Sequence, residues 1–183
     1  MPSVDKVRPA RCPCCGCGSR PTGGQLRLHG HGLRGRQVLG PVEPLRDPVA
    51  LDVMCRRYLC VACGAVVLVV PSGMLSGRRY SGPAIAQALA LFGLERMSPA
   101  EVRLRTSTDK IVGSTASTGW VTLLRWCEAV RDGRLFPEVR ACPATFSRRQ
   151  VAERAAGSMG GRAPPPVDAS LVVRAFVGAA RAA

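Results

Sequence analysis

The chain has 183 residues and carries 26 lysines and arginines against 12 acidic residues, a formal net charge of +14. No run approaches the ~18 apolar residues of a membrane span, and the N-terminus lacks the apolar core of a signal peptide. We therefore expect a cytoplasmic protein with no membrane segment, whose nine cysteines stay reduced and available to metal.

Two short cysteine motifs carry the strongest chemical signal. Cys12-Pro-Cys-Cys15-Gly16 lies near the N-terminus, and Cys60-Val-Ala-Cys63-Gly64 follows some forty residues later. Zn²⁺ prefers four soft ligands in a tetrahedron, and the glycine permits the positive φ that closes each turn. These motifs predict one structural zinc per chain, bound by Cys12, Cys15, Cys60 and Cys63. We expect a zinc ribbon over residues 11–80, after a flexible N-terminus at residues 1–10.

The register of the metal ligands stays open at the level of sequence. Cys14 and Cys17 form a second C-x-x-C interleaved with the first, and Gly18 follows Cys17 as Gly16 follows Cys15. Cys55 is another substitute ligand, although its position suits a strand better. His29 and His31 alternate with glycines, which is typical of an exposed turn rather than of zinc ligation.

Three strands are expected in the ribbon. They are a short polar strand over residues 32–39, a half-buried strand over 49–58 with Val49, Leu51 and Val53 on one face, and a strand over 66–70. A proline-rich loop separates the first two strands at residues 41–48. The long insert between Cys15 and Cys60 implies an elongated hairpin or an irregular loop.

Positive charge is concentrated in the same part of the chain. Residues 1–80 carry twelve basic and four acidic side chains, whereas residues 81–140 carry eight and six. A large cationic excess favours a polyanionic partner, usually nucleic acid, which such a surface contacts first through phosphates. The candidate nucleic-acid-binding residues, around the predicted strands and their exit, are Arg34, Arg36, Arg56, Arg57, Arg78 and Arg79.

Helical periodicity begins at Pro83. A first helix is expected over residues 83–93, and Ser98-Pro99-Ala-Glu101 is a capping-box start for a second helix through Thr106. A third helix is expected to begin within Ser114-Thr-Ala-Ser-Thr-Gly119 and to end near Gly133. Three such helices predict a helix-turn-helix-like domain over residues 81–135, on which Arg103, Arg105, Lys110 and Arg125 share a face.

Residues 136–183 are expected to hold a linker and C-terminal helices. Ser147 starts a helical stretch, residues 157–166 are a flexible linker, and Asp168 caps a helix through about Ala180. The apolar side chains of this last helix either cover the core or form a homodimer contact. The expected fold class is therefore α+β: a small antiparallel zinc ribbon followed by a helical domain.

The ribbon segments resemble those of a known family. Cys12-Pro-Cys-Cys15-Gly16, His31-Gly-Leu-Arg34 and Arg57-Tyr58-Leu-Cys60-Val-Ala-Cys63 are similar to the N-terminal zinc ribbon of bacterial insertion-sequence transposases. The resemblance covers residues 12–71 in motifs and 83–134 in layout only. It implies zinc ligation by the four cysteines, helix-turn-helix segments, and binding to DNA at the terminal repeats of the element.

The chain departs from that family in its catalytic part. Such transposases cut DNA with an acidic triad that holds two Mg²⁺ on an RNase H-like domain. Only Glu138, Glu153 and Asp168 remain after residue 135, in a tail with no series of strands. We therefore expect no enzymatic activity.

Two other classes of function are alternatives to DNA binding. The first is a zinc-stapled module that binds a protein or RNA, although aromatic residues, at 4%, are few for stacking on RNA bases. The second is a C-x-x-C thiol oxidoreductase, which lacks its usual βαβ context here.

Overall fold

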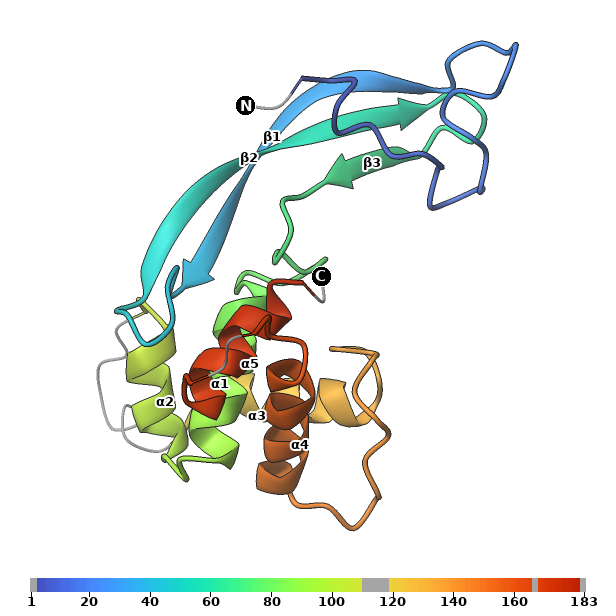
Figure 1. Cartoon of the computed structure of the whole chain (residues 1–183). Coiled ribbons are helices and arrows are strands. Elements are labelled where there is room, and N and C mark those ends of the chain that lie inside the picture. The colour runs from blue at the N-terminus through green and yellow to red at the C-terminus, as the bar shows by residue number, and fades with distance from the viewer. Residues whose placement is uncertain (1–2, 110–118, 166–167, 182–183) are drawn as a thin grey trace. The chain divides into compact units, whose positions relative to one another are not determined.

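The computed structural model of the protein describes residues 3–109, 119–165 and 168–181. Within them the fold is α+β, with an antiparallel sheet of strand order β1-β2-β3 and five helices (Figure 1). The elements are β1 (Leu28–Gly40), β2 (Val49–Cys60), β3 (Val66–Val69), α1 (Gly82–Gly93), α2 (Pro99–Thr106), α3 (Val121–Arg131), α4 (Arg148–Gly160) and α5 (Leu171–Ala179). None of these helices is long and apolar enough to cross a lipid bilayer.

Contacts group the chain into two compact units. The ribbon unit comprises Met1–Gln37 and Asp52–Pro71, and the helical unit comprises Val38–Leu51 and Ser72–Ala183. Strands β1 and β2 contribute to both units, because the tip of their hairpin is grouped with the helices. The expected ribbon boundary at residue 80 thus falls inside the helical unit, and the functional division of the chain stays a prediction.

The ribbon unit has a very small core. Its fully buried members are Cys12, Leu28, Tyr58 and Cys60, with a few valines packed around them. The Tyr58 hydroxyl donates a hydrogen bond to the carbonyl of Val4 at 2.5 Å, which holds the N-terminal segment on this core. Two of the four core residues, Cys12 and Cys60, belong to the C-x-x-C pairs, so the packing of this core and the positions of the cysteine sulfurs depend on each other.

The long hairpin is exposed over most of its length. In β1, every residue from His29 to Gly35 is exposed, and in β2 Val49 and Leu51 are 39% and 44% exposed. The expectation of a half-buried strand with these two side chains covered is therefore wrong. Alternation fixes which side chains share a face, but burial needs a second layer of structure, and the ribbon core covers only the part of β2 around Tyr58 and Cys60.

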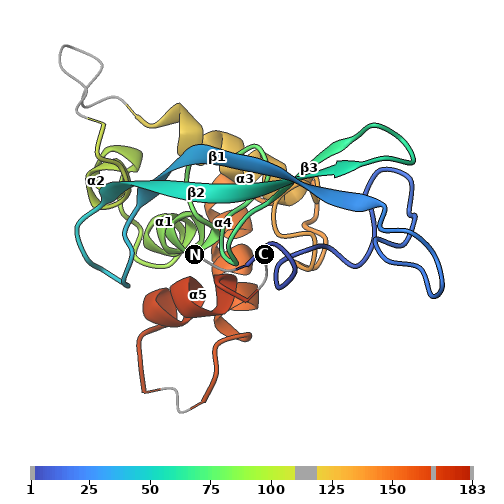
Figure 2. The ribbon, with the colours of Figure 1, turned by 90° about the horizontal axis from the view of Figure 1, so that it is seen from above.

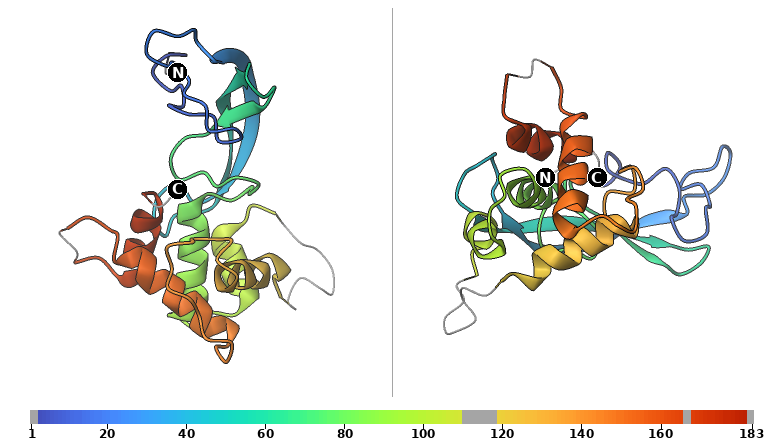
Figure 3. Two further views of the ribbon diagram at one scale, coloured as in Figure 1. Left: turned by 90° about the vertical axis from the view of Figure 1, so that its right-hand side faces the viewer. Right: turned by 90° about the horizontal axis from the view of Figure 1, so that it is seen from below.

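Helix α1 is the centre of the helical unit. All twelve of its residues are buried, and it packs against each of the other four helices (Figures 2 and 3). A helix that is apolar on all sides is stable only when it is enclosed, and Gly82-Pro-Ala-Ile-Ala-Gln-Ala-Leu-Ala-Leu-Phe-Gly93 is such a sequence. The Ser81 side chain accepts a hydrogen bond from the Ala84 N–H, which caps the start of α1.

Capping boxes define two further helix starts. The Ser98 and Glu101 side chains each bond the other residue's backbone N–H at α2, as expected. The same reciprocal pair, Ser147 and Gln150, begins α4. Lys110 and most of the expected start of the third helix, residues 114–118, lie outside the described residues, and α3 begins at Val121.

The C-terminal region differs from the prediction in two ways. Residues 157–160 are helical and end α4, so the expected linker does not begin there. Gly160 at the end of α4 and Gly178 in α5 allow these two helices to pack closely. A Cβ on Gly160 would lie 2.5 Å from Leu171 Cδ1, and a Cβ on Gly178 would lie 1.8 Å from the Met159 carbonyl oxygen. The cap of α5 is Ser170, whose side chain accepts from the Val173 N–H, and not Asp168.

The hairpin tip is bonded to α1. The side-chain oxygen of Gln87, which is 1% exposed, accepts a hydrogen bond from the Leu45 N–H at 2.8 Å. Gly40 passes so close to the helix that a Cβ would lie 2.4 Å from the Cβ of Ala84, and its φ is +117°. The proline-rich loop is therefore an ordered part of the helical unit.

Candidate metal centre and nucleic-acid interface

The structure brings the four cysteines of the two C-x-x-C pairs into one cluster. The Sγ atoms of Cys12, Cys15, Cys60 and Cys63 all lie within 4.8 Å of one another. Two of the separations, Cys12 to Cys63 and Cys15 to Cys60, are 3.8 and 3.9 Å. A tetrahedron of thiolates with metal–sulfur bonds of about 2.3 Å has edges of about 3.8 Å. The donor set and its spacing therefore fit a tetrahedral metal ion.

The two turns that present these cysteines have the same backbone geometry. In the first, the Cys12 N–H donates to the Cys17 carbonyl, and the Gly16 N–H donates to the Cys12 carbonyl. In the second, the Cys60 N–H donates to the Ala65 carbonyl, and the Gly64 N–H donates to the Cys60 carbonyl. The two glycines have φ of +72° and +74°. Each turn thus needs glycine at the position after its second cysteine.

Backbone N–H groups favour the thiolate form of one cysteine in each turn. Burial opposes ionisation of Cys60, but hydrogen bonds from the N–H groups of Cys63 and Ala62 lower its pKa to about 6. The pKa of Cys15 is lowered first by a backbone hydrogen bond from Cys17. Metal ions are bound by thiolates, so stabilisation of the ionised form of these two cysteines suits a metal ligand.

The other candidate ligands lie outside the four-cysteine cluster. Cys14 is exposed, and the thiol of buried Cys55 points to the Val53 carbonyl. Cys17 lies closer, with its Sγ 3.5 Å from that of Cys60, and hydrogen bonding to Cys15 and Cys60 raises its pKa to about 12. That bonding suits a neutral thiol donating to two thiolates. Gly18 does not share the positive φ of Gly16, so the backbone repeats only the register that begins at Cys12.

The two histidines lie in a strand rather than in the expected turn. His29 and His31 are exposed in β1, and the His29 ring bonds the Leu26 carbonyl at 2.8 Å. Neither belongs to the metal-binding cluster found among the described residues.

The six candidate arginines are divided between the two units. Arg34 and Arg36 lie on β1, and Arg56 and Arg57 lie on β2, all in the ribbon unit. Arg78 and Arg79 precede α1 and belong to the helical unit. Successive strand residues point to opposite faces, so Arg56 and Arg57 place positive charge on both sides of the sheet. The ribbon unit as a whole has nine basic against two acidic side chains.

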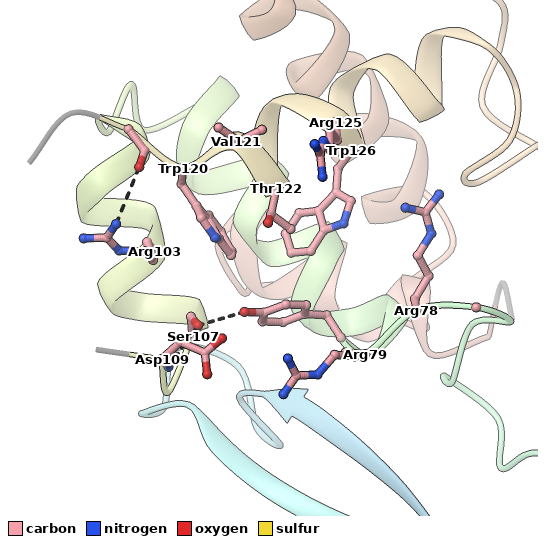
Figure 4. Close-up of a pocket in the computed structure, with 13 residues that line it drawn as sticks. Arg78, Arg79, Arg103, Ser107, Asp109, Trp120, Val121, Thr122, Arg125 and Trp126 are labelled. Carbon is pink, nitrogen blue, oxygen red and sulfur yellow. Dashed lines mark hydrogen bonds between the residues drawn. The ribbon is translucent and has the colours of Figure 1, made fainter. Parts of the chain in front are cut away.

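Exposed apolar side chains, which the sequence did not predict, accompany this charge. Leu33 and Met54 are 41% and 52% exposed on β1 and β2. A second feature missed from sequence is an aromatic cluster in the helical unit, formed by Tyr80, Trp120 and Trp126, whose ring centroids lie 5.0 to 5.8 Å apart. Tyr80 precedes α1, whereas Trp120 and Trp126 lie at the start of and within α3 (Figure 4), so no local motif indicates that the tyrosine meets the tryptophans.

Comparisons of the chain with models of known protein families, with curated proteins and with solved structures give no match.

Proposed function

We propose that this chain is a zinc-binding, DNA-binding protein related to the DNA-binding region of insertion-sequence transposases, without their catalytic chemistry. The observation that carries the proposal is the pair of matching cysteine turns at the base of a long, exposed, cationic hairpin. Four thiolates at tetrahedral spacing favour Zn²⁺ among the common cellular ions.

Zinc in this site has a structural role in the proposal. All four positions of the tetrahedron are filled by protein sulfur, which leaves no open position for a substrate or a catalytic water. The ion joins the N-terminal turn to the turn between β2 and β3, and so fixes the base of the hairpin.

The hairpin supplies the DNA contact. Arg34, exposed on β1, and the half-buried Arg57 on β2 are the residues that we assign to phosphates. Asp5, one of the two acids of the ribbon unit, is already paired with Arg8 and Arg20, so it does not neutralise the strand arginines. A two-stranded ribbon is narrow enough to enter the major groove, and arginines on both faces would then reach the two flanking backbones.

The helical unit contributes less to the proposed DNA contact. Helix α1 is buried along its whole length, so it cannot contact DNA. In a helix-turn-helix arrangement of α1 and α2, the helix that enters the DNA groove would therefore be α2, on which Leu104 and Arg105 are exposed. Its first turn carries Glu101, which faces phosphates unfavourably. We therefore place the main contact on the ribbon.

The test is the salt dependence of DNA binding by full-length protein containing one zinc. Fluorescence anisotropy with a short duplex, measured between about 50 and 200 mM salt, should show a linear fall of log K with log salt concentration. Arg34→Gln should reduce the slope by about 1, because each phosphate contact releases about one counterion. Arg162→Gln, which removes an exposed arginine of the helical unit, is the matched control and should leave the slope unchanged.

A zinc-stapled protein- or RNA-binding module is the second candidate. The observation that favours it is the exposure of Leu33 and Met54 among the hairpin cations, since apolar contacts add affinity that salt does not weaken. This module would be favoured if the protein does not bind duplex DNA, or if its DNA affinity is insensitive to salt and to Arg34→Gln. Protein that lacks zinc and has reactive thiols would instead favour a thiol oxidoreductase.

A further inference from the structure

Cys17 places an additional thiol against the cysteine cluster, and the metal site has no use for it. Its Sγ lies 3.5 Å from the Sγ of Cys60, closer than the 3.9 Å that separates Cys60 from its fellow ligand Cys15. Its side chain also packs on the small core of the ribbon unit, to which Cys60 belongs. The contact between Cys17 and Cys60 is therefore part of the folded ribbon.

The other cysteines outside the cluster have different surroundings. Cys14 is exposed, and the buried Cys55 directs its thiol to a backbone carbonyl. Cys127 and Cys142 belong to the helical unit. Cys17 is thus the thiol that is in position to react with a ligand of the proposed metal.

The backbone on each side of this contact is fixed by hydrogen bonds. The Cys17 carbonyl accepts from the Cys12 N–H, and Arg11 and Gly18 form an antiparallel bridge beside it. Cys60 is the last residue of β2 and starts the second cysteine turn. Both sulfurs are therefore held by ordered backbone, and their contact does not depend on a loose segment.

The two sulfurs differ in their access to solvent. Cys60 is 0% exposed, whereas Cys17 is half-buried. The susceptibility of a cysteine to oxidation depends on its exposure, so a small oxidant in solution reaches Cys17 and not Cys60. Cys60 can then react only with a sulfur that is already its neighbour.

A bound metal keeps its own ligands apart but does not restrain Cys17. In a tetrahedron of thiolates the sulfurs are about 3.8 Å apart, whereas the bond in a disulfide is about 2.05 Å long, so two ligands would have to leave their positions to join. Cys17 is not among the four ligands and needs to approach Cys60 by only about 1.5 Å. Joining these two cysteines removes one ligand from the metal.

We propose that a peroxide converts Cys17 and Cys60 into a reversible disulfide, and that this bond releases the metal. The Cys17 sulfur attacks the peroxide, the O–O bond breaks, and the thiol proton leaves with the departing oxygen as water, which gives a sulfenic acid. The Cys60 thiolate then attacks the Cys17 sulfur, the S–O bond breaks, and the S–S bond forms. One thiol and one thiolate lose two electrons, and hydrogen peroxide is reduced to one water and one hydroxide ion.

The two parts of this proposal have different foundations. Release of the metal rests on the proposed zinc site, whereas formation of the disulfide rests on the positions of the two sulfurs. Because the zinc would fix the base of the hairpin, its release would also weaken the proposed contact with DNA. Cys17 is thus a modification site through which an oxidant acts on the ribbon.

The test is peroxide treatment of the full-length protein containing one zinc. A chromogenic chelator follows zinc release, and peptide mapping without reduction locates the disulfides. We expect zinc release together with a peptide pair joined through Cys17 and Cys60, and dithiothreitol should reverse both changes. Cys17→Ser should lose this peptide pair and should keep its zinc over the time in which the original protein releases it.

Cys14→Ser is the matched control, because it removes an exposed thiol of the same turn, and it should release zinc like the original protein. The proposal is overturned if peroxide releases no zinc, if the mapped disulfide joins other cysteines, or if Cys17→Ser releases zinc as fast as the original protein. It is also overturned if Cys17→Ser binds no zinc, since Cys17 would then be a ligand. An original protein that binds no zinc would contradict the proposed function, and the mapping would still show whether the disulfide forms.

Discussion

Replacing Cys60 by serine should unfold the ribbon unit and leave the helical unit folded. Cys60 is fully buried, its Sγ lies 3.9 Å from that of Cys15, and it is also a member of the ribbon core. The substitution therefore removes a metal ligand and places a hydroxyl among apolar side chains. The helical unit has its own, much larger core, which contains no cysteine of the cluster.

The magnitude follows from how little else holds the ribbon together. Apart from the cysteines, its fully buried core side chains are Leu28 and Tyr58. Burial of two such side chains contributes about 3 to 6 kcal/mol, whereas structural zinc in small domains contributes about 10 to 16 kcal/mol. Since backbone ordering costs about 1 to 2 kcal/mol for each residue, two side chains cannot offset it over this unit. We expect loss of the metal and of most of the ribbon's stability together.

Zinc content and amide hydrogen exchange measure the two consequences. Cys60→Ser should contain no bound zinc and should lose protection at the amides of β2 and β3, while the amides of α1 stay protected. The matched control is Cys14→Ser, which changes an exposed thiol outside the cluster and should behave like the original protein. Retention of one zinc and of strand protection in Cys60→Ser, or equal zinc loss in Cys14→Ser, would refute the four-thiolate site.

Three further predictions concern other features. Cys17→Ser should keep one zinc per chain, because Cys17 is outside the cluster; loss of the metal in elemental analysis would make it a ligand. Gly178→Ala should lower the melting temperature of the helical unit sharply, because its Cβ would lie 1.8 Å from the Met159 carbonyl oxygen. Gly157→Ala, whose Cβ would meet nothing within 4 Å, should instead raise the free energy of unfolding by about 0.5 to 1 kcal/mol. Equal effects of the two substitutions would refute this packing. Burial raises the pKa of Tyr80 above its usual value of 10, so its contribution to stability is present below pH 10 and lost as pH rises above it; chemical denaturation of Tyr80→Phe should show a smaller alkaline loss than the original protein.

Local backbone signals in the sequence predicted some helix starts and missed others, since α2 begins at its capping box whereas α5 is capped by Ser170 and not by Asp168. The Ser98-Pro99-Ala-Glu101 motif specifies its own hydrogen bonds, and α2 begins at the residue that it indicates. Glycine was less informative, because the same residue marks a flexible linker or a close helix contact. Only the position of α5 shows that Gly160 serves the second purpose.

The metal cluster was predictable and a pocket in the helical unit was not, for a related reason. Each cysteine turn encodes its geometry within five residues, through a glycine of positive φ. What the sequence leaves open is the choice between interleaved registers, and in the structure Gly16, unlike Gly18, has the positive φ of Gly64. The pocket formed by the segment before α1, the end of α2 and the start of α3 depends instead on segments that meet only after the helices have packed. Its arginines were therefore assigned separately, Arg78 and Arg79 to the surface around the exit of the strands, and Arg103 and Arg125 to a face of the helical domain.

The hydrogen bond between Leu45 and Gln87 has a consequence for the order of events during synthesis. Residues 1–71 emerge first and include everything that the cysteine cluster needs, so a metal can be captured early. The hairpin tip, at residues 38–51, must wait until α1 has been made some forty residues later. No single proteolytic cut separates the two units, since the chain passes from one to the other three times. A fragment ending at residue 71 would contain all four cysteines of the cluster, but its hairpin tip would lack helix α1 and the hydrogen bond to Gln87.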